Sequence, residues 1–133
     1  MAVLYVAKSA ALLKWASDVG LGKHMYKVGV AEDPAALLAE GFAGETDWTI
    51  IKTQDAGDLT DAEAVQRLSR KEELVNANYY PRLRGAEGIF KVKQANVENS
   101  LFVSRMLEDK DAKPKKAKAA DFADYLIRNT LKG

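Results

Sequence analysis

Four short runs of β-branched, aromatic and aliphatic residues recur along the chain, and stretches with helical spacing separate them. The runs span residues 2–7, 25–30, 48–53 and 88–92. Runs of this length are typical of buried strands, and the intervening stretches exclude a purely helical or a purely β fold. We therefore predict an α/β fold, a small domain with a single sheet and flanking helices.

Local capping signals indicate where three of the helices begin. Ser9 precedes the first apolar stripe, and Asp33 is followed by Pro34, which is the expected order of a capping residue and a first helical residue. Thr60 and Glu63 have the spacing of a capping box. Each signal satisfies backbone N–H groups that a helix start leaves unpaired, so each predicts a helix.

The later helices set the expected domain organisation. The helix that starts at Thr60 is expected to reach about Asn78, and another follows the last strand. Residues 1–109 are predicted to form the domain and residues 110–120 a basic, Lys-rich linker. Residues 121–133 form a C-terminal helical tail, which either folds back on the core or docks on a partner.

Composition excludes several classes of catalytic site. The 133 residues contain no cysteine and one histidine, His24, so disulfides, thiolate metal sites and a cysteine nucleophile are excluded. A zinc site or a Ser-His triad is not expected either. No stretch approaches the roughly 18 to 20 apolar residues that span a bilayer, and residues 1–5 have no basic leader. We expect a cytoplasmic protein without a membrane contact.

The net charge of +1 conceals an uneven distribution. Residues 31–63 carry nine acidic residues against Lys52 alone, whereas residues 64–94 carry seven basic and three acidic residues. This asymmetry is compatible with a polyanionic partner on one side of the protein only. Charges that simply coat solvated faces are the alternative.

Three motifs together resemble the GIY-YIG nuclease superfamily, in its branch of small stand-alone phage and bacterial proteins. Leu4-Tyr5-Val6 stands where the family has its first tyrosine strand, and Tyr26-Lys27-Val28-Gly29 where it has the second motif. Glu72, Asn76 and residues 87–90 are similar to the family's later Glu, His and closing strand. The resemblance spans about residues 4–107.

The resemblance implies an Mg²⁺- or Mn²⁺-dependent endonuclease site. Glu72 would hold the metal ion, Tyr5 or Tyr26 would orient or deprotonate the attacking water, and Asn76 would stand in the His position. One carboxylate with waters and phosphate oxygens can suffice for a hard cation. From the residues alone, two half-buried core tyrosines and a glutamate on a surface charge face remain the alternatives.

Departures from the family pattern indicate a degenerate site. The family carries a phosphate-binding Arg on the helix after the second motif, and counting along the chain gives Leu37 instead. Leucine cannot donate the paired hydrogen bonds that a guanidinium makes to phosphate. Asn76 cannot shuttle a proton as histidine does. The resemblance therefore predicts a fold without full catalytic machinery.

Basic residues suggest contacts with nucleic acid. The segment 78–85 interleaves tyrosines with Arg82 and Arg84, which suits base stacking and phosphate contact; a basic turn with inward-facing tyrosines is the alternative. The expected nucleic-acid-binding residues are Lys27, Arg67, Arg70, Arg82, Arg84 and Lys91.

Three functions follow from these patterns. The first is a catalytically inactive protein without a cofactor that binds DNA, RNA or a protein working on nucleic acid. The second is an Mg²⁺- or Mn²⁺-dependent endonuclease. The third is a phage or bacterial protein–protein interaction factor that uses the acidic stretch 32–63 or the C-terminal tail.

Overall fold

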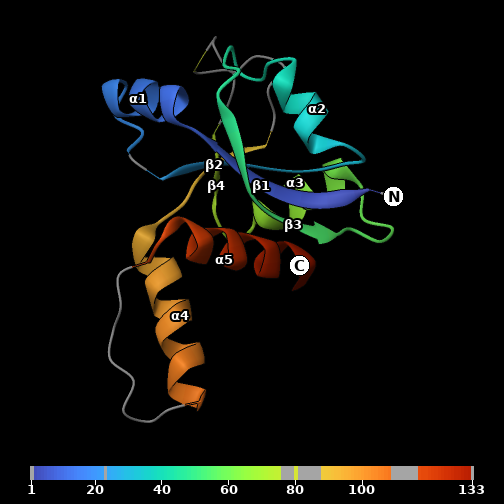
Figure 1. Ribbon diagram of the computed structural model, residues 1–133. Coiled ribbons are helices and arrows are strands. Elements are labelled where there is room, and N and C mark those ends of the chain that lie inside the picture. The colour runs from blue at the N-terminus through green and yellow to red at the C-terminus, as the bar shows by residue number, and fades with distance from the viewer. Residues whose placement is uncertain (1, 23, 76–79, 81–87, 109–116, 133) are drawn as a thin grey trace.

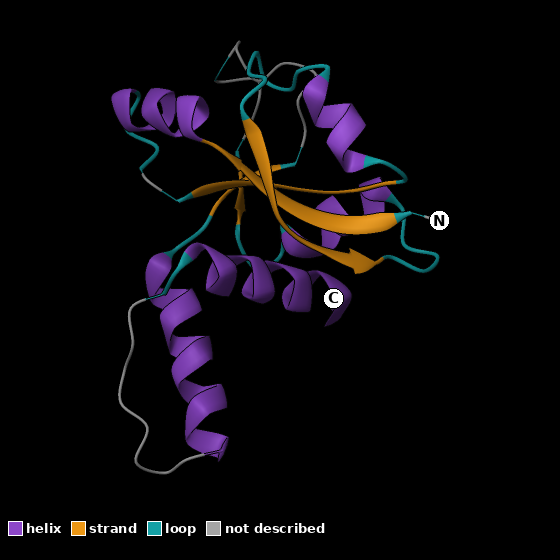
Figure 2. Ribbon diagram, in the orientation of Figure 1, coloured by secondary structure: helices purple, strands orange, loops and turns teal. Residues whose placement is uncertain are grey.

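The polypeptide folds around one five-stranded sheet with helices on both faces (Figure 1, Figure 2). The structure, a computed structural model, describes residues 2–22, 24–75, 80, 88–108 and 117–132. Its elements in chain order are β1 (Val3–Ser9), α1 (Ala10–Asp18), β2 (Met25–Ala31), α2 (Pro34–Ala39), β3 (Trp48–Asp55), α3 (Asp61–Leu68), β4 (Glu73–Leu74), β5 (Ile89–Lys91), α4 (Gln94–Glu108) and α5 (Ala119–Lys132). The predicted α/β class, with a single sheet and a C-terminal helix, is confirmed.

All neighbouring strands in the sheet are antiparallel, in the order β3-β1-β2-β5-β4. β1 lies between β2 and β3, and Tyr5 on β1 lies opposite Gly29 on β2. β5 pairs with β2 only from Met25 to Lys27, so the rest of β2 has no strand on that side among the described residues. The inner position of β1 and β2 explains why their sequences are nearly continuously apolar.

The three predicted helix starts are confirmed. The Ser9 side chain accepts a backbone N–H of α1 at 3.1 Å, and Asp33 does the same for α2 at 3.2 Å, with Pro34 as the first helical residue. Thr60 and Glu63 form the expected capping box at the start of α3. Local hydrogen bonding therefore sets these boundaries, as the sequence indicates.

The start of α1 also receives a carboxylate from a distant part of the chain. Asp47 accepts hydrogen bonds from the Ser9 hydroxyl and, at 3.0 Å, from the backbone N–H of Ala11. These bonds favour the charged form, and the bond from Ser9 contributes most to the lowered pKa of Asp47. The residue that precedes β3 is thereby tied to α1.

The predicted extent of α3 is wrong. The helix ends at Leu68 rather than near Asn78, so Glu72 does not lie on it. The chain instead forms β4, in which Leu74 lies opposite Phe90. Leu74 follows Leu68 by six residues, so in a continuous helix the two side chains would not lie on the same face. Pairing of β4 with β5 partly buries Leu74 instead.

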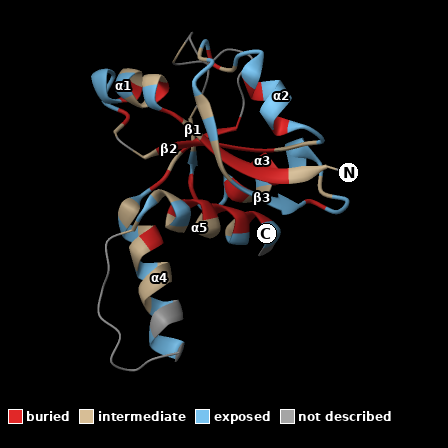
Figure 3. Ribbon diagram, in the orientation of Figure 1, coloured by how far each residue is buried: buried red, intermediate tan, exposed pale blue. Residues whose placement is uncertain are grey.

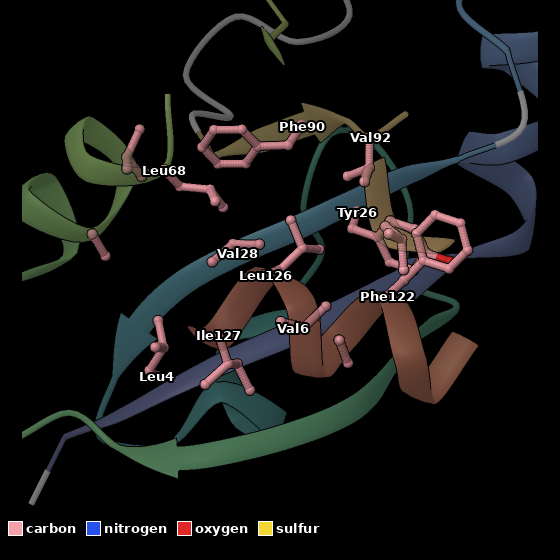
Figure 4. Packing of buried hydrophobic residues seen from close by; sticks show 14 of the residues in the cluster. Leu4, Val6, Tyr26, Val28, Leu68, Phe90, Val92, Phe122, Leu126 and Ile127 are labelled. Atoms are coloured by element: carbon pink, nitrogen blue, oxygen red, sulfur yellow. The ribbon is translucent and has the colours of Figure 1, made fainter. Parts of the chain in front are cut away.

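Each face of the sheet carries its own hydrophobic packing. Under α3 and α5 lies the largest cluster, and Figure 4 shows its side chains meeting from strands and helices. Its fully buried members include Leu4, Val6, Val28, Leu68, Phe90 and Leu126. On the other face α1 and α2 cover two smaller clusters that include Leu12, Met25, Tyr5 and Leu38.

The C-terminal helix belongs to this packing. Phe122, Ala123, Leu126 and Ile127 of α5 are buried in the largest cluster. The ring of Phe122 stacks on Tyr26 with centroids 5.3 Å apart. Of the two expectations for the tail, the described residues therefore support folding back on the core.

The fourth helix extends away from the sheet beyond its first turns (Figure 1, Figure 3). Val97 near its start is buried, whereas Val103, Met106 and Leu107 further along are exposed. Among the described residues, no helix has both the length and the apolar character needed to cross a membrane.

Replacing Phe122 with alanine should test the packing of α5. Phe122 is 2% exposed, so Phe122→Ala is expected to lower the free energy of unfolding by about 3–5 kcal/mol. Leu131→Ala, at a position on the same helix that is 43% exposed, serves as the control and should cost far less. Urea denaturation followed by circular dichroism measures both; equal midpoints for the two variants would show that α5 does not carry the core.

Candidate functional site

The two tyrosines predicted as catalytic lie on opposite faces of the sheet. Tyr5 lies opposite Gly29, and Tyr26 is three residues from Gly29 on the same strand, so their side chains project to different sides. Tyr5 packs with the cluster under α2, and Tyr26 stacks on Phe122 under α5. The structure therefore does not bring the two phenols together.

Both tyrosines are buried, and burial is the main cause of their altered ionisation. Loss of solvent raises the pKa of Tyr5 to about 12, with a smaller contribution from the negative charge of Asp61. Burial likewise raises the pKa of Tyr26 to about 12. Neither phenol is therefore prepared to act as a base at neutral pH.

A polar centre forms around Gly29 on the Tyr5 face. A Cβ atom at Gly29 would lie 2.7 Å from Asp61 Oδ1, 2.9 Å from Lys27 Nζ and 3.1 Å from Tyr5 Oη. Three polar atoms from β1, β2 and α3 thus converge on one glycine. Any larger residue at position 29 would collide with this arrangement.

Lys27 is enclosed rather than exposed to a ligand. It is 3% exposed, and its ammonium group lies 4.7 Å from the ring centroid of Phe42 and 5.7 Å from that of Tyr5. It donates a hydrogen bond to the carbonyl of Val28 at 3.3 Å. Ring faces and carbonyl oxygens stabilise a buried ammonium ion, so Lys27 is a structural cation in this arrangement.

Asp61 accepts a backbone hydrogen bond from the part of β2 that extends past its pairing with β5. Its Oδ1 atom accepts the backbone N–H of Val30 at 2.9 Å, and the carbonyl of Gly88 accepts that of Val28 at 2.9 Å. Gly88 has φ of +96°, and a Cβ there would lie 2.6 Å from Lys27 Nζ. The Tyr5–Lys27–Asp61 centre therefore holds together the sheet edge and the start of α3.

Glu72, the predicted metal ligand, is a buried carboxylate with its own hydrogen-bond donors. It is 5% exposed and accepts from the Tyr125 hydroxyl at 2.7 Å, from Asn96 Nδ2 at 3.1 Å and from the Lys93 backbone N–H at 3.4 Å. Burial and the Glu72 carboxylate raise the pKa of the Tyr125 phenol above its ordinary value. Glu72 thus joins the chain before β4 to α4 and α5.

This environment does not fit the expected Mg²⁺ or Mn²⁺ ion. Hard cations take several oxygen ligands, and both Glu72 oxygens already accept protein hydrogen bonds. Within the described ranges, no three His, Asp or Glu side chains gather into a metal-binding group.

Several predicted basic residues gather at the β4 end of the sheet. Glu73 lies opposite Lys91 across the β4–β5 pair, and the Glu72 carboxylate holds the backbone of Lys93 beside the turn after α3. We call the following residues the basic edge: Arg67, Arg70, Lys71, Lys91 and Lys93. Three of these, Arg70, Lys71 and Lys93, are exposed, and the other two are partly buried.

Lys27 and Leu37 are not part of this surface. Lys27 is enclosed in the polar centre described above, and Leu37 lies exposed on α2. Asn76, Arg82 and Arg84 lie outside the residues that the structure describes.

Asp61 was not among the residues singled out from the sequence. It was visible only as an acidic residue in the first turn of a helix, where carboxylates are common. Its bond to Val30 crosses 31 positions of sequence, and no local pattern specifies such a contact.

Comparison with protein-family models, curated proteins and solved structures found no match to this chain. The resemblance to the GIY-YIG superfamily accordingly stays a hypothesis, supported only by the short motifs quoted above.

Replacing Glu72 with glutamine should separate a structural role from metal binding. The amide nitrogen of glutamine cannot accept a hydrogen bond, so at least one of the three donors loses its acceptor, and we expect a loss of about 1–3 kcal/mol in unfolding free energy. Adding Mg²⁺ or Mn²⁺ should leave the melting temperature of the unmodified protein unchanged. A metal-dependent rise in that temperature that disappears in Glu72→Gln would contradict this assignment.

The two buried tyrosines should stay protonated well above the ordinary phenol pKa. Their pKa is raised in the folded state, so stability is intact below the unfolded-state value of 10.0 and is lost as pH rises towards about 12. Spectrophotometric titration of phenolate absorbance, compared between the unmodified protein and the variants Tyr5→Phe and Tyr26→Phe, measures the ionisation of each phenol. Both variants should titrate like the unmodified protein up to about pH 11. Loss of a phenolate signal near pH 10 in either variant would contradict burial.

Proposed function

We propose that this protein is a nucleic-acid-binding domain that has the fold class of the GIY-YIG superfamily without its catalysis. Two observations carry the proposal: Tyr5 and Tyr26 lie on opposite faces of the sheet, and both carboxylate oxygens of Glu72 already accept protein hydrogen bonds. A phosphodiester hydrolase needs its water-activating and charge-stabilising groups around one phosphate. Such a convergence is lacking among the described residues.

Exposed cations on the basic edge support nucleic acid as the partner. Arg70, Lys71 and Lys93 are exposed at the end of the sheet farthest from β3, and the only acidic side chain exposed among residues 67–93 that the structure describes is Glu73. Lysine and arginine side chains at such an edge can contact consecutive phosphates without reading the bases. The expected binding is therefore dependent on salt and tolerant of sequence.

The residue at the position of the missing family arginine agrees with the absence of catalysis. Leu37 is 44% exposed on α2, in the acidic part of the chain, where a phosphate backbone would be repelled. In this proposal the protein binds nucleic acid without a cofactor and acts in the cytoplasm. A nucleic-acid-associated protein, bound through the same basic edge, is the alternative partner if duplex DNA does not bind.

Removing charge from the basic edge should flatten the salt dependence of DNA binding. We expect Arg70→Ala/Lys93→Ala to reduce the slope of log Kd against log salt by roughly 1.8, because each lost phosphate contact removes about 0.9 on duplex DNA. Lys14→Ala/Lys118→Ala, which removes two exposed positive charges elsewhere, is the matched control and should leave the slope unchanged. Fluorescence anisotropy with a labelled duplex measures both. Arg82→Ala/Arg84→Ala tests the two arginines of the segment 78–85 in the same assay.

Three outcomes would contradict the proposal. Equal effects of the basic-edge and control variants on the slope would show that binding depends only on the net charge of the protein. No DNA binding at low salt would show that nucleic acid is not the partner and would favour a protein partner. Nicking of supercoiled plasmid with Mg²⁺ or Mn²⁺ would favour the endonuclease, provided that Glu72→Gln and Tyr5→Phe abolish it. Nicking that survives both substitutions indicates contamination.

A further inference from the structure

On the side opposite the basic edge, the last strand of the sheet is β3, and its outer edge is unpaired among the described residues. β3 is eight residues long, pairs only with β1, and has no strand on its outer side among the described residues. Most of its residues are exposed, as Figure 3 shows along its length. An unpaired strand edge presents backbone N–H and C=O groups that can pair with another extended chain.

Beside this edge, between α2 and β3, lies a pocket of about 240 Å³ that is lined mainly by apolar residues. Its lining residues are Ala35, Leu38, Ala39, Thr46, Trp48 and Ile50. Trp48 and Ile50 are two positions apart on β3, so they share one face of the strand. The pocket is smaller than a site for a drug-sized ligand and has the size for a single large side chain.

The walls of the pocket are fixed before any partner arrives. The Trp48 indole donates a hydrogen bond to the carbonyl of Phe42 at 3.0 Å, and the two rings meet edge to face at 5.7 Å. Leu38 is 2% exposed and forms part of the floor. A preformed pocket avoids the ordering cost that a mobile surface would pay on binding.

The edge is partly protected against unspecific pairing. The register with β1 shifts between Val6 and Ala7, so that Ile51 is an extra residue on β3, and Lys52 follows it. Bulges and lysines are common protection at sheet edges. The Lys52 ammonium group is engaged by Asp124, however, and the stretch from Trp48 to Ile50 next to the pocket keeps a regular register.

The charge around this edge selects the chemistry of the partner. Asp47 and Asp55 lie at the two ends of β3, and Glu40 and Glu45 lie on the segment that leads into it. Residues 31–63 as a whole carry nine acidic residues against Lys52 alone. This charge would repel a nucleic acid and attract a basic peptide.

We propose that β3 and its pocket bind an extended basic peptide of a partner protein, which adds a strand to the sheet. The peptide backbone pairs with the outer edge of β3, and one aliphatic or aromatic side chain enters the pocket. Lysine or arginine residues on either side of that anchor face the acidic residues. This mode takes affinity from main-chain hydrogen bonds and specificity from the pocket. It is independent of nucleic-acid binding at the basic edge.

The probe is a fluorescein-labelled peptide of nine residues in which Lys and Arg alternate with Thr and Val and the central residue is Leu. We expect saturable binding by fluorescence anisotropy. Replacing the central Leu with Ala should weaken binding by about tenfold or more, since the buried side chain is lost. Methylating alternate backbone nitrogens of the peptide should weaken it at least as much, because the methyl groups block strand pairing.

Two exposed alanines on α2 provide matched variants of the protein. Ala35 lines the pocket and Ala36 does not, so Ala35→Leu should fill the pocket and weaken peptide binding about tenfold, whereas Ala36→Leu should change it less than twofold. Circular dichroism melting checks that both variants fold.

Four results would overturn the proposal. Three of them are no binding, equal binding by the two variants, and equal binding of the methylated peptide, which would indicate electrostatic adhesion only. Self-association of the protein that blocks the peptide would also overturn it, because the edge would then belong to a second copy. An excess of duplex DNA that leaves peptide binding unchanged supports two separate surfaces.

Discussion

The buried carboxylate of Glu72 is the interaction on which the arrangement of the C-terminal half depends. A buried charge without donors is strongly destabilising, so its hydrogen bonds to Lys93, Asn96 and Tyr125 are required once the side chain is enclosed. Because these donors come from the start of α4 and from α5, satisfying one charge positions two helices. The same bonds occupy the carboxylate that the nuclease hypothesis needs for a metal ion, so the structural and the catalytic uses of Glu72 compete.

The sheet order gives the molecule two edges of opposite character. β4 ends the sheet beside exposed arginine and lysine residues, and β3 ends it among acidic residues. With a strand spacing of about 4.8 Å, the five strands separate these edges by roughly 19 Å. A polyanion at the basic edge and a basic peptide at β3 therefore do not compete for space. If both proposed partners bind, the domain would connect a nucleic acid to a protein, with the sheet as a spacer between them.

Local signals in the sequence suffice for the strands and the helix starts, because Ser9, Asp33 and Thr60 act on neighbours within one helical turn. They do not suffice for β4, whose Leu74 is held by Phe90 across the sheet. The placement of Tyr26 away from Tyr5 depends on strand register, and a shift of one residue would reverse it. The candidate site was predicted least well because Glu72, Lys27 and Asp61 owe their surroundings to distant segments.

The best motif of the family resemblance, residues 26–29, has a physical explanation that involves no chemistry on a substrate. β2 loses its partner strand after Lys27, and Asp61 and the carbonyl of Gly88 take over its backbone N–H groups. A Cβ atom at Gly29 would displace the phenol of Tyr5, the ammonium group of Lys27 and the carboxylate of Asp61, which approach this glycine closely. A chain can therefore retain this tyrosine–lysine–glycine pattern for folding alone, so the motif by itself is no argument for phosphodiester hydrolysis.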